Sequence, residues 1–334
     1  MNINKVCILG GTGFVGSTLV SKLASIGIKT RLISRHPERY RHLLVLPGVE
    51  IVEADITEIN RLSYYLHDID AVINLVGILN DNTLDGAGFR KIHIDLPKSI
   101  VQACQKNNIK RLLQMSALHA DAGTAPSHYL RSKGEGENHL HIYSDKGIQI
   151  TTFRPSIIFG PGDDFFNRFA KLLKVTPVIC PVPRANSRFA PVYVGDVADS
   201  MIKHLLDPNS NGLRVDLCGP HTYSMMEIMQ YTASVLGIKR KFIALPDRAS
   251  KLMAHLSDIA NSIPLLSASW NMLIPGFKEA RFSIDNYRSL LVDSVCDDAE
   301  TQNTAIEDIV PKYLGSQNTQ HQFDKFRSEV PTIR

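Results

Sequence analysis

The segment Val6-Cys-Ile-Leu-Gly10-Gly-Thr-Gly13-Phe-Val-Gly16 decides the fold, because three evenly spaced glycines join an apolar strand to an amphipathic helix. These glycines permit a tight turn, a close approach of the backbone to a pyrophosphate and close helix–strand packing. The amides at the helix start face the phosphates, and the helix dipole favours their charge. The alternative is an ordinary glycine-rich turn. We predict a dinucleotide-binding loop made by Gly10, Thr12, Gly13, Phe14, Val15 and Gly16.

Short apolar runs alternate with segments long enough for helices through the first half of the chain. Repeated strand–helix–strand units of this kind form a parallel sheet covered on both faces. We therefore predict an α/β fold, a Rossmann-type doubly wound parallel sheet with a smaller, discontinuous C-terminal region. The expected strands are Val6–Leu9, Thr30–Ile33, Val49–Val52, Ala71–Leu75, Arg111–Met115 and Ile150–Phe153.

The expected domain boundaries follow from where this alternation loosens. Residues 1–158 form the nucleotide-binding domain, which about 188–218 completes, since glycines and prolines from Gly160 onward indicate loops. Residues 159–187 and 219–290 form the smaller substrate or partner region. Residues 291–334, rich in Gln, Asn, Ser and Thr, are expected to be a tail with little core of its own.

Composition excludes several classes of protein. The chain has 334 residues, 37 Lys plus Arg against 33 Asp plus Glu, and 44% hydrophobic residues, which is globular composition. The net charge of +4 is too small to indicate a nucleic-acid partner. Because Leu252–Phe277 contains charged residues and Pro264, we expect no transmembrane segment there. We expect mainly core, with an amphipathic contact surface as the alternative.

The five cysteines and the N-terminus bear on the compartment. The cysteines lie far apart without a CxxC pair, so we predict neither a disulfide framework nor a metal knuckle, and a reducing compartment. The histidines show no metal-ligand spacing, so no metal is expected. The first residues run straight into a strand, which indicates no leader. We expect a cytoplasmic protein of bacterial origin with peripheral inner-membrane contact, or a matrix-side protein if it is a processed organellar one.

The end of the second strand indicates which dinucleotide is bound. An NAD-preferring site carries an acid there, whereas this chain reads Leu32-Ile-Ser34-Arg35-His36. The Arg35 guanidinium suits a ribose 2′-phosphate, and residues 1–50 are rich in Lys and Arg. We predict NADP(H), with contacts from Ser34 and Arg35, while NAD(H) remains an alternative. Arg35 and Arg39 could also merely be solvated charges at a helix start.

Two further strand ends give weaker signals. Asp55 and Ile56 follow the third strand, where a carboxylate can accept a hydrogen bond from the adenine amino group. Leu75, Val76 and Gly77 follow the fourth strand, where a small residue lets the cofactor pass. Each pattern is also found at ordinary strand ends.

A candidate catalytic pair lies in His128-Tyr129-Leu-Arg-Ser-Lys133. Tyr129 and Lys133 are four residues apart on an expected helix, so their side chains share a face. The ammonium is expected to lower the pKa of the phenol and to bind ribose hydroxyls. Ser116, at the end of the fifth strand, is expected to bind a substrate carbonyl. The alternatives are a chance YxxxK match and a Ser116 that only caps its loop.

These residues together resemble an extended short-chain dehydrogenase/reductase. The segments Phe153-Arg-Pro-Ser-Ile-Ile-Phe-Gly160-Pro-Gly-Asp and Ala190-Pro-Val-Tyr-Val-Gly195-Asp196 are similar to an atypical subgroup. That subgroup is typified by the nucleotide-binding accessory subunit of respiratory complex I and its bacterial relatives. Related proteins are linked to ubiquinone biosynthesis.

The resemblance implies an NADP(H)-binding protein whose nucleotide is largely structural, near complex I or a quinone-biosynthesis assembly. It also implies that Pro155 and Ser156 lie beside the nicotinamide. His93 stands where catalytic members carry an Asn that supports a proton relay. The alternatives are an active NADPH-dependent oxidoreductase or epimerase/dehydratase using Tyr129, Lys133 and Ser116, and a sensor of the nucleotide's redox state.

Overall fold

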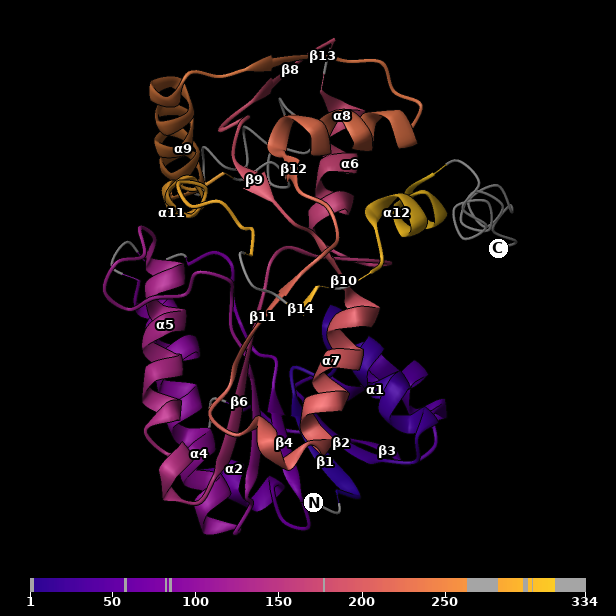
Figure 1. Cartoon of the computed structure of the whole chain (residues 1–334), viewed down its shortest axis with the longest axis vertical. Coiled ribbons are helices and arrows are strands. Elements are labelled where there is room, and N and C mark those ends of the chain that lie inside the picture. The colour runs from indigo at the N-terminus through magenta and orange to yellow at the C-terminus, as the bar shows by residue number, and fades with distance from the viewer. Residues whose placement is uncertain are drawn as a thin grey trace, which may run out of the picture. The chain divides into compact units, whose positions relative to one another are not determined.

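The computed structural model describes residues 3–56, 59–81, 83, 86–176, 178–262, 282–296, 300–301 and 303–315. The chain divides into two compact units (Figure 1). The first unit comprises Met1–Ser156, Val194–Cys218 and Cys296–Thr301. The second unit comprises Ile157–Tyr193, Gly219–Val295 and Gln302–Arg334.

A parallel sheet forms the centre of the first unit. Its eight described strands run in the order β14-β11-β6-β5-β4-β1-β2-β3, so the sheet reverses direction of growth between β1 and β4. This confirms the predicted doubly wound α/β fold. The strands are β1 (Lys5–Leu9), β2 (Lys29–Ser34), β3 (Val49–Glu53), β4 (Ala71–Asn74), β5 (Arg111–Met115), β6 (Gln149–Pro155), β11 (Arg214–Cys218) and β14 (Glu300–Thr301).

Helices cover both faces of this sheet (Figure 1). One face carries α1 (Phe14–Ser25) and α7 (Val194–Leu206); the other carries α2 (Ile59–Tyr65), α4 (Leu96–Lys106) and α5 (His128–His141). Strands β4 and β5 are buried along their whole length, as expected of a parallel sheet covered on both faces. The short helix α3 (Ala87–Arg90) continues through a π-helical turn, η2 (Lys91–Asp95), into α4. Three 3₁₀ segments are η1 (Pro37–Val45), η3 (Ser144–Lys146) and η4 (Pro208–Ser210).

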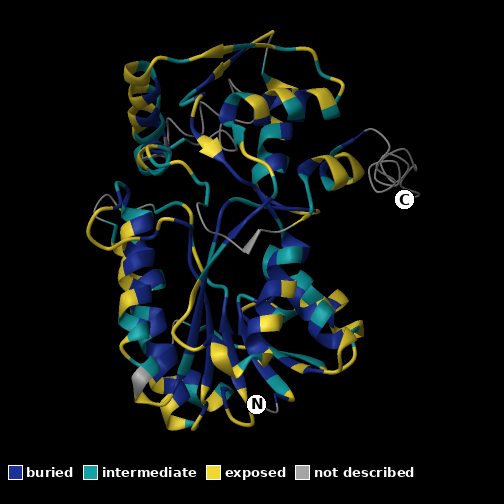
Figure 2. Cartoon of the chain, viewed as in Figure 1, coloured by how far each residue is buried: buried dark blue, intermediate teal, exposed yellow. Residues whose placement is uncertain are grey.

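The second unit has small paired strands and its own apolar core (Figure 2). The strand pairs are β7 (Ile158–Phe159) with β10 (Val192–Tyr193), β8 (Ile179–Val182) with β13 (Lys241–Ala244), and β9 (Arg188–Phe189) with β12 (Tyr223–Ser224). The helices are α6 (Phe165–Val175), α8 (Met225–Val235), α9 (Asp247–Ser262), α11 (Ile284–Ser289) and α12 (Ile306–Leu314). None of the helices in the described residues is long and apolar enough to cross a membrane.

The C-terminal segment differs from the expected coreless tail. Ile306 and Val310 of α12 are buried in the core of the second unit. The Tyr313 hydroxyl donates a hydrogen bond to Asp163 Oδ2 at 2.5 Å, and β14 joins the sheet of the first unit. Residues 316–334 of the expected tail lie outside the described residues.

A disulfide joins Cys218 to Cys296, so the prediction that the cysteines form no disulfide is wrong. The two residues are 78 positions apart, and sequence spacing gives no hint of their proximity. They meet because β14 pairs with the end of β11, where Cys218 is the last residue, and Cys296 precedes β14 by four residues. The inference of a reducing compartment from cysteine usage therefore loses its basis. Cys7, Cys104 and Cys180 are free and buried.

Candidate nucleotide site and catalytic pair

The glycine loop connects β1 to α1. Gly10 has a φ of +78°, a conformation that side chains with a Cβ rarely adopt, and its carbonyl accepts a hydrogen bond from Gly13 N at 3.0 Å. A Cβ on Gly16 would lie 2.5 Å from Gly10 O and from Gly11 Cα and O. Both positions therefore require glycine. Because no side chain caps the N-terminus of α1 and no acid occupies its first turn, the amides there suit an anionic ligand.

The end of β4 lies directly against this loop. Leu75 N donates to Leu9 O at 2.9 Å, and a Cβ on Gly10 would lie 3.2 Å from Leu75 C and Val76 N. The Asn74 side chain holds the turn, because its Oδ1 accepts from Val76 N at 3.1 Å. Loop and strand end thus meet at the switch between β1 and β4, where open α/β sheets bind ligands.

The ends of β2 and β3 carry the residues predicted to contact the adenosine half. Ser34 is buried, and its Oγ accepts a hydrogen bond from His36 N at 3.2 Å. Arg35 is exposed beside it, and Asp55 and Ile56 are partly buried directly after β3. Register pairing sets β2 next to β1 and β3 next to β2, so these ends share the edge of the sheet that carries the glycine loop.

Lys133 links α5 to the ends of two strands. Its side chain is buried, and its Nζ donates to Met115 O at 3.2 Å. A Cβ on Gly77 would lie 3.0 Å from the same Nζ, so the ammonium also approaches the segment after β4. Burial lowers the pKa of Lys133 to about 8, and the Glu137 carboxylate partly offsets this effect.

Tyr129 lies one helical turn before Lys133. Lys133 Nζ is 6.0 Å from the centroid of the Tyr129 ring, and burial raises the pKa of this phenol to about 12. The net shift therefore runs opposite to the expected lowering, because burial dominates in this arrangement. The ring packs edge-on against Phe89 and His93, with centroids 6.0 Å and 5.6 Å away.

His93 is fixed by hydrogen bonds at both ring nitrogens. Nε2 accepts from Ile78 N at 3.2 Å, so Nδ1 carries the proton and donates to Ser132 Oγ at 2.9 Å. Ser132 Oγ in turn donates to Tyr129 O at 2.8 Å. Burial, and then the nearby Lys133 ammonium, lower the pKa of His93 to about 2, so the imidazole stays neutral.

Ser116, Pro155 and Ser156 lie at the ends of β5 and β6. Ser116 N donates to Phe153 O at 2.7 Å, and Ser156 N donates to Leu217 O at 2.9 Å. The Ser116 residue is 4% exposed, and its hydroxyl has no hydrogen-bond partner among the described residues. A buried hydroxyl without a partner at a strand end favours a bound ligand there.

Two residues beside the Tyr129–Lys133 pair, Ser132 and Glu137, were not predicted from the sequence. Ser132 lies three residues after Tyr129, and Glu137 lies four residues after Lys133, so helical spacing alone could have placed both beside the pair. Glu137 is buried, and its carboxylate accepts a bifurcated hydrogen bond from Arg154 Nε, at 3.0 Å and 2.9 Å, and a second one from Arg154 Nη2 at 2.5 Å. It also accepts a hydrogen bond from Arg214 Nε at 3.2 Å. This cluster anchors α5 to β6 and β11.

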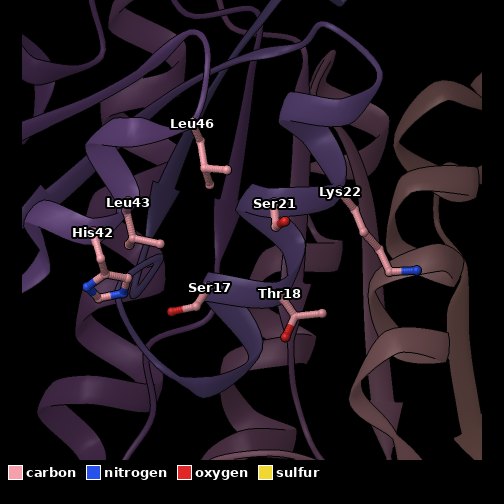
Figure 3. A pocket seen from close by; sticks show the side chains of 7 residues that line it. All are labelled: Ser17, Thr18, Ser21, Lys22, His42, Leu43 and Leu46. Atoms are coloured by element: carbon pink, nitrogen blue, oxygen red, sulfur yellow. The ribbon is translucent and has the colours of Figure 1, made fainter.

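A pocket of about 500 Å³ lies between α1 and η1 (Figure 3). It contains none of the predicted site residues, and its Lys22 forms an ion pair with Asp199 at 2.6 Å. Its lining is Ser17, Thr18, Ser21, Lys22, His42, Leu43 and Leu46. We therefore do not assign the nucleotide to it.

Comparison with known proteins matches residues 6–216 to the model of the NAD dependent epimerase/dehydratase family. The chain is 25% identical to the NADH-ubiquinone oxidoreductase 40 kDa subunit of Neurospora crassa, over 78% of this chain and 68% of that protein. It is 29% identical to the ceramide reductase of Caulobacter vibrioides, over 77% of this chain and 78% of that protein. It is 28% identical to the mouse NADH dehydrogenase [ubiquinone] 1 alpha subcomplex subunit 9, over 79% of this chain and 64% of that one, less than two thirds of its length.

Solved structures show the same fold. A Bacillus cereus UDP-glucuronic acid 4-epimerase variant in complex with NAD superposes with a TM-score of 0.63 at 20% identity. That match covers 72% of this chain and 86% of the epimerase.

Proposed function

Because the chain belongs to the NAD dependent epimerase/dehydratase family, we propose that it binds NADP(H) and supports respiratory complex I or ubiquinone metabolism through a largely structural nucleotide. The proposal that the nucleotide is largely structural rests on the way His93 is held in place. Its two ring nitrogens are both engaged, and the hydrogen-bond chain through Ser132 ends on the Tyr129 carbonyl rather than on the phenol. These hydrogen bonds therefore provide no proton relay to the Tyr129 phenol through His93, which stands at the position that carries Asn in catalytic members.

The residues present fit a dinucleotide. The glycine loop leaves no room for a Cβ at Gly16, the first amides of α1 have no side-chain cap, and Ser116 has an unpartnered buried hydroxyl. Gly10 through Gly16 would hold the pyrophosphate, and Lys133 would hold the ribose. Ser34, Arg35, Asp55 and Ile56 would hold the adenosine half, while Leu75, Val76, Gly77, Pro155 and Ser156 would border the nicotinamide half.

The preference for the phosphorylated cofactor rests on Arg35. The guanidinium is exposed at the end of β2, and the segment after that strand carries no acid until Glu38. An arginine fork binds a phosphate through two charge-assisted hydrogen bonds. A 2′-phosphate would satisfy it, whereas the 2′-hydroxyl of NAD(H) would not.

Arg35→Asp is expected to weaken NADPH binding roughly 10- to 100-fold, because charge-assisted hydrogen bonds are lost and an anion faces the 2′-phosphate. NADH binding should stay within about threefold, since its ribose accepts an acid there. Calorimetric titration of both cofactors measures the difference, with exposed Arg39→Asp as the matched control. Equal losses for the two cofactors, or equal losses in the control, would contradict the assignment of Arg35.

The respiratory role is supported by the names of the relatives. Two of the three are subunits of the mitochondrial NADH-ubiquinone oxidoreductase, at 25% and 28% identity. The partners would be complex I or a quinone-biosynthesis assembly, and the protein would lie in the cytoplasm at the inner membrane, or on the matrix side in mitochondria.

Loss of the protein from its host is expected to lower membrane NADH:quinone oxidoreductase activity or quinone content. Tyr129→Phe should restore both to the wild-type level while retaining nucleotide, because the phenolic proton serves no reaction. Normal activity and quinone content in the deletion strain would overturn the proposed function. A nucleotide-bound Tyr129→Phe protein that fails to rescue would show that the phenol is needed for chemistry.

The second candidate is an active oxidoreductase or epimerase/dehydratase. Ser116 favours it, because an unpartnered buried hydroxyl lies on the residue next to Met115, whose carbonyl binds Lys133. When bound, NADPH would supply the hydride for reduction of a carbonyl carbon. Tyr129 would then give its proton to the carbonyl oxygen, Ser116 would polarise that oxygen, and Lys133 would stabilise the phenolate. The ceramide reductase relative carries a reductase name at 29% identity.

A further inference from the structure

Helix α9 of the second unit carries its large apolar side chains outward. Leu252 is 59% exposed, and Leu256 and Ile259 are each 56% exposed. Their spacing of four and three residues places them on one stripe along the helix. Figure 2 shows the exposed positions along α9, at the upper left of the view. Leu252, Leu256 and Ile259 are called the α9 stripe below.

The opposite face of α9 is the buried one, and small residues make it. Ser250 and Ala254 are both fully buried. At 100° per residue, Ser250 and Ala254 lie on the side of the helix away from the stripe. An amphipathic helix that only covered a core would point its leucines inward and its serine and alanine outward. The arrangement in α9 is the reverse.

Specific contacts fix this orientation. Asp247 Oδ2 accepts a hydrogen bond from the Tyr287 hydroxyl at 2.8 Å, and Asp247 Oδ1 forms an ion pair with Arg184 at 2.8 Å. Further along the helix, Ser257 Oγ accepts from Phe282 N at 3.2 Å and Asp258 Oδ2 accepts from Ile284 N at 2.8 Å. Turning the stripe inward would break all four interactions.

Basic residues border the stripe. Arg248, Lys251 and His255 are exposed and lie on one flank of it at helical spacing. In the described part of α9 the acidic residues are Asp247 and Asp258, and both accept hydrogen bonds from within the second unit. The outward face therefore combines apolar side chains with positive charge, the combination with which helices lie in the interface of an anionic membrane.

We propose that α9 binds a membrane surface that carries anionic lipid headgroups, with the α9 stripe in the acyl boundary and Arg248 and Lys251 at the phosphates. A helix of 16 residues is about 24 Å long and would lie parallel to the surface. The inference goes beyond nucleotide binding and does not depend on it.

Vesicle flotation of the full chain tests this proposal, with phosphatidylcholine alone and with added phosphatidylglycerol as probes. Binding to the anionic vesicles is expected, weakening as salt is raised, with little binding to neutral ones. Leu256→Ser and Lys251→Glu should each weaken it roughly tenfold. Ile142→Ser is the matched control, because Ile142 is also 56% exposed but belongs to the first unit.

Several results would overturn the proposal. They are absence of binding to anionic vesicles, equal binding to both vesicle types, and equal weakening by Ile142→Ser. Concentration-dependent self-association that Leu256→Ser abolishes would assign the stripe to a second copy of the chain instead. A fall in unfolding free energy with Leu256→Ser and no vesicle binding would assign it to packing within the chain.

Discussion

Gly16→Ala is expected to weaken NADPH binding by at least about 100-fold. The added Cβ would lie 2.5 Å from Gly10 O and from the Gly11 backbone, and none of these atoms is a flexible side-chain end. The first turn of α1 would have to move away from the loop, which would misdirect the amides that we propose face the pyrophosphate. Loss of several charge-assisted hydrogen bonds together accounts for a change of that size.

Calorimetric titration with NADPH measures this effect, and Gly123→Ala is the control. A Cβ on Gly123 meets only Asp121 Oδ1, at the ordinary distance of 3.5 Å. The control should bind NADPH as the wild type does. If Gly16→Ala binds within about threefold of the wild type, the nucleotide does not sit on this loop.

Glu137→Leu is expected to lower the free energy of unfolding by about 3 to 5 kcal/mol, because it leaves Arg154 partly buried without its counter-ion. The Glu137 carboxylate is 1% exposed, and Arg154 and Arg214 both bind it. The carboxylate also raises the pKa of Arg154, although burial acts in the opposite direction. Denaturant unfolding with an unchanged m-value measures the loss.

Two further variants test whether the loss of stability comes from the buried charge rather than from any change on α5. Glu135→Gln, on the same helix but with a side chain 47% exposed and 4.0 Å from Arg90, should change stability by less than about 0.5 kcal/mol. Glu137→Leu combined with Arg154→Met should recover part of the loss, since fewer charges remain buried. A Glu137→Leu protein as stable as the wild type would show that the cluster does not anchor α5.

The fold was predictable because short, continuous stretches of sequence determine its strands and its glycine loop. The apolar runs at Val6–Leu9, Ala71–Leu75 and Arg111–Met115 lie in β1, β4 and β5, which are buried on both faces. The glycine loop was predictable for the same reason. Gly10 makes the tight turn and Gly16 makes the close backbone contact, and both lie within one stretch of seven residues. What helical spacing places together, such as Tyr129 and Lys133, also lies together.

Features that depend on distant pairing were not predictable. The Cys218–Cys296 disulfide follows from the pairing of β14 with β11. The two-residue strand β14 contains no apolar run from which a strand could be predicted. The raised pKa of Tyr129 follows from burial of the phenol, which the spacing of Tyr129 and Lys133 on one helix face does not reveal. Of the stretch Leu252–Phe277, residues 252–262 form part of α9 with its apolar stripe exposed, and 263–277 lie outside the described residues.

The most direct measurement of nucleotide binding is equilibrium unfolding of the wild-type chain with and without each cofactor. NADPH at about 100 times its dissociation constant should raise the free energy of unfolding by about 2.7 kcal/mol, because it binds only the native state. NADH at the same concentration should raise it by less, since it lacks the 2′-phosphate for Arg35. An unfolding curve that neither cofactor shifts would contradict a nucleotide-stabilised fold.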